Sequence, residues 1–134
     1  MATKDSAIIT ALGEVPLFSG CNKKQLRTIA ASGKVLKRKE GSTIVEEGSS
    51  GVAFFVVLSG SADVVKGDQR VARLMPGDFF GEMALILDET RNANVVASED
   101  SELFTFTRWA FKSLVTTNPQ LCYTVMQAVA ARQG

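Results

Sequence analysis

The sequence of 134 residues contains no histidine and only two cysteines. Without histidine, Ser–His and Cys–His nucleophile pairs cannot form, and most catalytic zinc and iron sites lose their usual ligand. Cys21 and Cys122 lie far apart in the chain and in no metal-binding spacing, so we expect buried thiols in a reducing cytoplasm. We therefore expect a protein that is not an enzyme and that holds neither a cofactor nor a metal ion.

Long apolar runs and an excess of one charge are also missing. No run approaches the roughly 20 residues needed to cross a membrane, and the polar N-terminus lacks a signal-peptide pattern. The net charge of +1 offers no electrostatic reason to expect nucleic acid. The basic run at residues 37–39 is followed at once by Glu40, and we interpret it as a solvated turn. We expect a cytoplasmic domain that contacts neither nucleic acid nor membrane.

The residues that are present suit one compact domain. Apolar residues make up 46% of the chain, which is enough for a core. Residues 1–33 have helical spacing, with Leu12 and Leu26 among the apolar positions. The second run begins after Asn22, a good N-cap, and stops at Gly33. We predict an N-terminal helical segment over residues 1–33.

Short β-rich runs alternate with turn residues from position 34 to position 107. Many short strands at regular spacing are typical of a β-sandwich, jelly roll or small barrel. Thr107 can cap a following helix, and Asn118-Pro119 can begin another, so residues 108–134 are predicted to be helical. The predicted fold class is α+β, an antiparallel β-roll or jelly-roll barrel flanked by N-terminal and C-terminal helices. We expect one domain over residues 1–134.

Three apolar residues of the segment after Thr107 allow two interpretations. Trp109, Phe111 and Leu114 could line a groove for a partner, or they could pack against the barrel. Large aromatic side chains bury much apolar area, so we favour core packing.

The stretch FGEMALILDETRNA, residues 80–93, interrupts the β-rich region and is too apolar for an ordinary exposed loop. Gly81 permits a close approach to the backbone, and small Ala84 follows nearby. The apolar run contains helix formers, and the start of a helical turn presents unpaired N–H groups that favour an anion. Arg91 offers a fork of donors for phosphate, whereas Glu82 accepts from a hydroxyl.

A ligand with one anionic group, a nearby hydroxyl and an apolar part would use all of these groups, and a nucleotide with a single phosphate charge fits. The alternative is a Glu82–Arg91 ion pair that closes a surface loop. The physics of the residues alone leaves both interpretations open.

The same stretch strongly resembles the phosphate-binding cassette of cyclic nucleotide-binding domains. The family pattern is Phe-Gly-Glu, a small residue two places on, Leu, and later an arginine followed by a small residue and alanine. Here it reads Phe80-Gly81-Glu82-Met83-Ala84-Leu85, then Arg91-Asn92-Ala93. Outlying stretches also resemble the family: VPLF at 15–18, the glycines of the strand region, and LMPGDFFGE at 74–82. The resemblance covers nearly the whole chain and places the cassette at residues 80–93.

The resemblance implies a role for each matching residue. Glu82 would accept from the ribose 2′-hydroxyl, Arg91 would pair with the cyclic phosphate, and Gly81 would leave room for the ribose. Backbone N–H groups of the cassette would bind phosphate oxygens, and side chains of the barrel wall would pack against the base. The implied ligand-binding residues are Gly81, Glu82, Met83, Ala84, Arg91, Asn92, Val64, Leu74 and Arg132.

This sequence departs from the family pattern at three positions. Thr90 stands where proline is usual, and Asn94 stands where threonine or serine is usual. Asn92 replaces the residue that is often alanine in cyclic-AMP kinase regulators and threonine or serine in cyclic-GMP kinases and many channels. We expect cyclic AMP to be the ligand, with cyclic GMP as the alternative.

Arg132, near the end of the last predicted helix, also has two interpretations. It could be a solvated side chain that interacts with the helix C-terminus, or it could resemble the arginine that folds over the base in channel members of the family. Leu121, Val125, Ala128 and Val129 lie near the same helical face, which would let that face pack inward.

The resemblance implies a regulatory sensor that moves its flanking helices when a cyclic nucleotide binds. We recognise no helix-turn-helix, kinase, transferase or membrane segment, so the partner is expected to be an output domain or protein outside this chain, with a channel as one candidate. The rivals are an interaction module of the same fold that no longer binds ligand, a cyclic-GMP-selective sensor and a cupin-like enzyme. The absence of histidine argues against the last.

Overall fold

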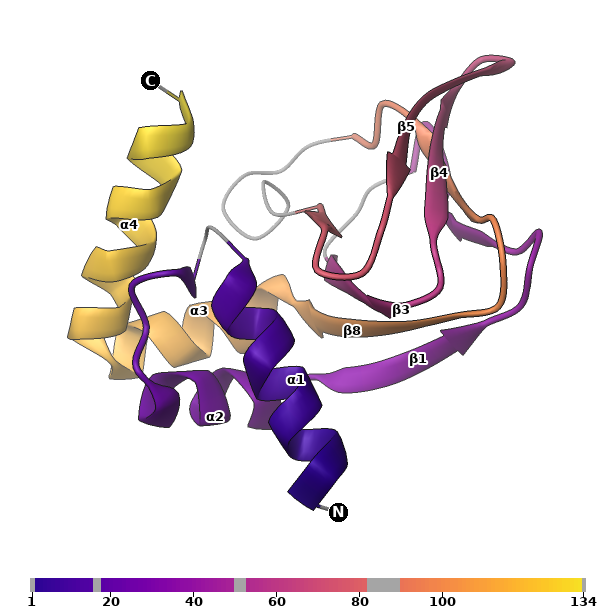
Figure 1. Ribbon diagram of the computed structural model, residues 1–134. Helices are drawn as coiled ribbons and strands as arrows, with labels where there is room; N and C mark the ends of the chain where they lie inside the picture. Colours follow the sequence, from indigo (N-terminus) through magenta and orange to yellow (C-terminus); the bar gives the residue numbers. More distant parts are fainter. Residues whose placement is uncertain (1, 16–17, 50–52, 82–89, 134) are drawn as a thin grey trace.

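The computed structural model describes residues 2–15, 18–49, 53–81 and 90–133 (Figure 1). Helices α1 (Ala2–Glu14) and α2 (Lys23–Ala31) precede the strands, and helices α3 (Arg108–Thr117) and α4 (Pro119–Gln133) follow them. Figure 1 shows both pairs of helices gathered at one end of the strands, with the β4–β5 hairpin extending at the other. The N-terminal and C-terminal segments therefore build one helical layer.

The strands form two four-stranded sheets in which every described pairing is antiparallel. The order in the first sheet is β1 (Lys34–Arg38), β8 (Ser101–Thr107), β3 (Ala53–Ser59) and β6 (Phe79–Phe80). The order in the second is β2 (Thr43–Val45), β7 (Asn94–Ala97), β4 (Ala62–Lys66) and β5 (Gln69–Leu74). The predicted α+β fold is confirmed, as a roll of two sheets and not as one closed barrel.

Local capping explains where the helices begin. The Asn22 side chain accepts from the backbone N–H of Gln25 at 2.8 Å, and the Gln25 side chain accepts from the backbone N–H of Asn22 at 2.9 Å. This reciprocal capping box satisfies N–H groups that have no partner within the helix. The Thr107 hydroxyl accepts from Ala110 N–H at 3.2 Å, and Pro119 is the first residue of α4. The predicted helix starts are confirmed.

The larger core lies between the helices and the first sheet. Its centre is aromatic: the Phe54 ring lies 5.9 Å from that of Phe18 and 5.4 Å from that of Phe106, both in edge-on geometry. Phe111 and Leu114 are buried against this core, as predicted. Trp109 is not, because it is 65% exposed. Residue 109 lies on the opposite side of α3 from residues 111 and 114, so the prediction of core packing was wrong for Trp109.

A smaller apolar cluster is formed by residues of both sheets. Phe55 of β3 stacks on Phe80 of β6, with ring centroids 4.9 Å apart and an interplanar angle of 13°. The buried members are Val45, Phe55, Ala62 and Val95, and the half-buried members are Leu36, Ile44, Ala53, Val64, Leu74 and Phe80. Gly81 follows directly after Phe80, so this cluster forms the apolar side of the candidate site.

Both cysteines are free thiols and half-buried, whereas the sequence predicted full burial. Cys21 packs at the margin of the larger core, and its burial raises the pKa of its thiol to about 11. Cys122 follows the buried Leu121 by one residue, which places it at the edge of the buried face of α4. Of the helices in the described part of the chain, none has the length and apolar character needed to cross a membrane.

Candidate functional site

Arg91 is held by the first strand residue of β3. Its Nη2 donates to the carbonyl oxygen of Ala53 at 2.6 Å, across 38 positions of sequence. The Arg91 side chain is half-buried, and Ala53 belongs to the smaller apolar cluster. The guanidinium is therefore anchored at the margin of apolar surface, where a charge–charge interaction is screened less than on an open surface.

Gly81 lies directly against this guanidinium. Its φ of +83° is in the left-handed region, and an added Cβ would lie 2.8 Å from Ala53 O and 2.8 Å from Arg91 Nη1. A side chain at this position would displace one of its neighbours, so glycine is required both by the backbone conformation and by the space. The sequence predicted a close approach at Gly81, and the structure shows that Arg91 makes one.

The turn at residues 46–49 holds the backbone of Arg91. Gly48 N–H donates to Arg91 O at 2.8 Å, and Arg91 N–H donates to Ser49 O at 2.8 Å. Asn94 adds a side-chain bond, because its Oδ1 accepts from Glu47 N–H at 2.6 Å. Sequence reasoning missed these contacts. Every residue has the same backbone N–H and C=O groups, so the sequence does not show which of them form these bonds. The one feature of the sequence that pointed to these contacts was the amide side chain of Asn94 at the start of β7.

Val64 and Leu74 were predicted to pack against the base of the ligand, and that role stays a prediction. Both are half-buried, on β4 and β5, and both pack in the smaller apolar cluster. Antiparallel pairing places Val64 opposite Val95 of β7 and Leu74 opposite Ala62. The fold thus brings Gly81, Arg91 and these two apolar side chains around one cluster, although they are distant in sequence.

The remaining predicted site residues are placed less completely. Asn92, next to Arg91, is exposed. Glu82, Met83 and Ala84 lie outside the described residues, so their roles and the alternative Glu82–Arg91 ion pair stay predictions. The backbone of Arg132 belongs to α4, but its side chain lies outside the description, as do the side chains of Ala128 and Val129.

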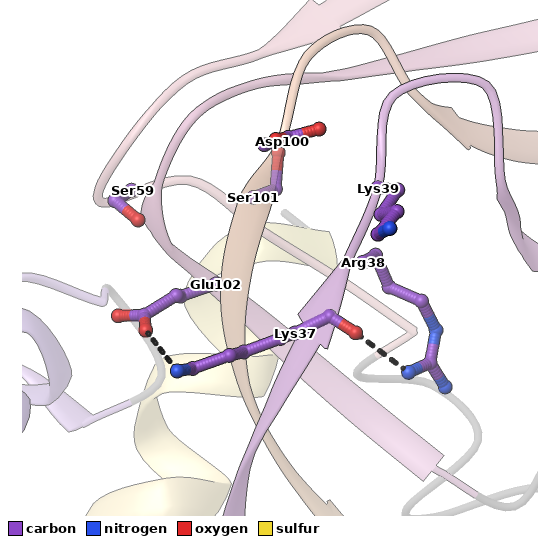
Figure 2. Close-up of a pocket in the computed structure, with 7 residues that line it drawn as sticks. All are labelled: Lys37, Arg38, Lys39, Ser59, Asp100, Ser101 and Glu102. Carbon is purple, nitrogen blue, oxygen red and sulfur yellow. Dashed lines mark hydrogen bonds and ion pairs between the residues drawn. The ribbon is translucent and has the colours of Figure 1, made fainter.

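One surface depression, of about 510 Å³, lies at the far end of the first sheet (Figure 2). Basic and acidic side chains share it, and Lys37 Nζ lies 4.0 Å from Glu102 Oε2. Three basic and two acidic side chains line the depression, so their charges largely offset one another and favour no particular ion strongly. Lys37 and Arg38 end strand β1, so the prediction of a turn at residues 37–39 was wrong for these two. Pairing with β8, distant in sequence, makes them strand residues.

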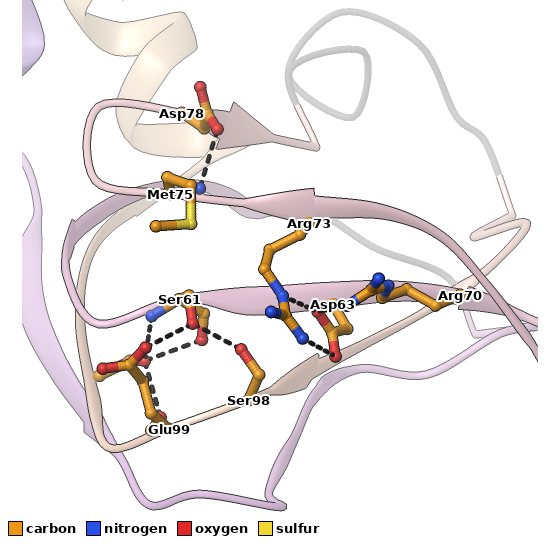
Figure 3. A network of polar contacts seen from close by, with 9 residues as sticks. Ser61, Asp63, Arg70, Arg73, Met75, Asp78, Ser98 and Glu99 are labelled. Carbon is orange, nitrogen blue, oxygen red and sulfur yellow. Dashed lines mark hydrogen bonds and ion pairs between the residues drawn. The ribbon is translucent and has the colours of Figure 1, made fainter.

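Two polar groups beside the second sheet are structural (Figure 3). Ser61 Oγ lies 2.6 Å from Ser98 Oγ and donates to Glu99 Oε2 at 2.8 Å. Arg73 Nε donates to Asp63 Oδ1 at 2.8 Å across the β4–β5 pair, and this bond lowers the pKa of Asp63. No group of three or more potential metal ligands occurs among the residues that the structure describes.

Comparison with known proteins gives sequence relatives of two kinds. The chain is 42% identical over 106 residues to a cAMP-dependent protein kinase regulatory subunit of Aspergillus fumigatus, a match that covers 78% of this chain and 26% of that protein. It is 33% identical over 100 residues to a cGMP-dependent protein kinase of Eimeria tenella, covering 74% of this chain and 10% of that protein. The chain therefore spans about a quarter or less of these relatives.

A solved structure shares the fold. The N-terminal domain of a transcriptional regulator from Streptomyces coelicolor A3(2) superposes with a TM-score of 0.88 at 23% identity, covering 92% of this chain and 90% of that one. The family model described as the cyclic nucleotide-binding domain matches residues 35–118, a range that contains both Gly81 and Arg91. The two-sheet roll and this match lead to one conclusion: the chain belongs to the cyclic nucleotide-binding domain family.

Proposed function

We propose that this chain is a regulatory module that binds a cyclic nucleotide, with cyclic AMP as the preferred ligand, and that it catalyses no reaction. The observation that carries the proposal is Arg91, which is half-buried and held at the margin of an apolar cluster by Ala53 O at 2.6 Å. A guanidinium in such a place presents a planar fork of donors that suits a phosphate.

The other parts of the ligand would meet the groups around Arg91. The base would pack on the half-buried side chains of Val64 and Leu74, since apolar surface favours a ring that leaves water. Gly81 would leave room for the ribose, and Glu82 would accept from its 2′-hydroxyl. Backbone N–H groups of Met83, Ala84 and Asn92 would complete the phosphate site.

The output would be transmitted through the helices. Leu121 and Val125 bury one face of α4 in the larger core, and α4 packs next to α3. A ligand that binds one arrangement of these helices better than another would shift their population. We propose that the whole of residues 1–134 acts as one such domain, and that Arg132 contacts the bound ligand from α4.

The partner is proposed to be a protein or domain outside this chain. Similarity to a kinase regulatory subunit supports a kinase-type output more than the channel that the resemblance of the sequence suggested. A cytoplasmic location is proposed on the same similarity and on the two free cysteines, which fit a reducing compartment.

Isothermal titration with cyclic AMP and cyclic GMP tests the proposal. Arg91→Ala leaves a bound phosphate without its counter-charge, so we expect affinity to fall by roughly 30-fold or more. Arg91→Lys should lose most of the binding too, because an ammonium cannot reproduce the fork. Arg38→Ala, at the far end of the first sheet, is the matched control and should bind like wild type. Undetectable binding by wild type, or full binding by both Arg91 variants, would contradict the proposal.

A cyclic-GMP-selective sensor is the second candidate. Asn92 is exposed directly beside Arg91, and its amide has an acceptor that a guanine amino group could meet. The similarity to a cGMP-dependent protein kinase points the same way. A competition assay that cyclic GMP wins clearly would establish this candidate, and Asn92→Ala should then remove the preference.

A further inference from the structure

Asn94 makes a contact that the proposed ligand site does not explain. It begins β7, three residues after Arg91, and it is half-buried. Its Oδ1 accepts from Glu47 N–H at 2.6 Å, so it links two segments that are 47 positions apart in sequence.

The turn that Asn94 holds is a closed unit. Ser49 N–H donates to Glu46 O at 3.2 Å, and Ser49 Oγ donates to the same oxygen at 2.6 Å. Gly48 has a φ of +87°, which lets the chain reverse here without strain. A displacement of Glu47 would therefore move the neighbouring residues of the turn with it.

The turn is bonded to both backbone polar groups of Arg91, its N–H and its carbonyl oxygen. Gly48 donates to Arg91 O and Arg91 N–H donates to Ser49 O, each at 2.8 Å. Beyond the backbone, the guanidinium reaches Ala53 O at 2.6 Å. The backbone of Arg91 is thus set by the turn, and the far end of its side chain is set by β3.

We propose that Asn94 is a positioning residue for Arg91. Its amide oxygen holds the 46–49 turn against the Arg91 backbone. The turn thereby fixes the position of Arg91, so that the guanidinium points toward the phosphate of the ligand. A displacement of about 1 Å in a binding group weakens its interaction with a rigid ligand strongly. This inference rests on the proposed function, because it concerns how the phosphate partner is aimed and not whether there is one.

The test compares two asparagines whose side-chain oxygens each accept a hydrogen bond from one backbone N–H. Asn22 Oδ1 accepts from Gln25 N–H at 2.8 Å, and Asn94 Oδ1 accepts from Glu47 N–H at 2.6 Å. Cyclic AMP affinity is measured by titration and stability by urea unfolding for Asn94→Ala and Asn22→Ala. Both variants lose one bond of the same kind, so both should be less stable. Only Asn94→Ala should bind cyclic AMP more weakly, by about tenfold.

Asn94→Asp keeps the acceptor at the same place and adds a charge. In about 0.5 M salt, which screens that charge, it should bind more tightly than Asn94→Ala under the same conditions. Should Asn94→Ala not fold, Asn94→Gln takes its place, because a longer side chain keeps the amide but cannot place its oxygen at the same point.

The outcomes separate this inference from the proposed function. If wild type binds no cyclic nucleotide, the proposed function fails. If wild type binds and Arg91→Ala does not, the function stands, and an unchanged affinity of Asn94→Ala overturns the positioning role. Equal losses of affinity in Asn94→Ala and Asn22→Ala, or no recovery in Asn94→Asp, overturn it as well.

Discussion

Replacing Gly81 by alanine should impose two separate costs. The first is conformational: a φ of +83° places an L-residue in the left-handed region, at about 1–2 kcal/mol. The second is steric, because the new Cβ would lie 2.8 Å from both Ala53 O and Arg91 Nη1. Overpacking of this kind costs typically about 1–3 kcal/mol. Together we expect Gly81→Ala to lower the free energy of unfolding by about 2–5 kcal/mol.

The two groups that the new Cβ would meet differ in how easily they can move. Ala53 O belongs to the backbone of β3, which pairs with β8 and β6, whereas the guanidinium ends a flexible side chain. We therefore expect Arg91 to move and Ala53 to stay. The displaced guanidinium would meet the phosphate poorly, and cyclic AMP affinity should fall by about tenfold or more.

Gly41→Ala is the control for the conformational cost. Gly41 has nearly the same φ, +87°, and its added Cβ would meet nothing within 4 Å. It should lose only the conformational part, about 1–2 kcal/mol, and keep wild-type affinity. Urea unfolding and titration of the two variants give the difference directly. If Gly81→Ala loses no more stability than Gly41→Ala and binds normally, the close approach of Arg91 does not govern this position.

Three further predictions concern other parts of the chain. Burial raises the pKa of the Cys21 thiol to about 11. At pH 8 the thiol should therefore be alkylated about 100-fold more slowly in the folded than in the urea-unfolded protein, as followed by peptide mass spectrometry. Equal rates of alkylation would contradict this. The bond from Arg73 lowers the pKa of Asp63, so its stabilisation is present above the unfolded pKa of about 3.9 and is lost as the pH falls through the lower folded pKa. Arg73→Met should make the free energy of unfolding less sensitive to acid below about pH 4, and the effect should be small because the pair is solvent-accessible; an unchanged acid profile would count against it. If Arg132 covers the ligand, cyclic AMP should slow hydrogen exchange in α4, and Arg132→Ala should reduce that effect; identical exchange with and without ligand would mean that α4 is not the lid.

Structural features that depend only on nearby residues were predicted correctly from the sequence alone. Asn22 caps α2, Thr107 caps α3 and Pro119 begins α4, as predicted. Each of these features depends on the residue itself or on a neighbour a few positions away, so the local sequence contains the information needed to predict it. The alternation of short strands and turns likewise predicted an antiparallel roll, and the cassette pattern at residues 80–93 predicted the family.

Tertiary structure decided the partners that lie far apart in sequence. Arg91 was a predicted phosphate partner, but its anchor is the carbonyl of Ala53, and a backbone oxygen is the same in every residue. The sequence showed Asn94 only as a departure from the family pattern. The fold places Glu47 next to it and makes its side chain a hydrogen-bond acceptor for that residue. Trp109 is exposed because the core meets the other side of α3. Composition and spacing describe a chain along one dimension, whereas these contacts depend on which distant segments pack together, and that follows from sheet order and register.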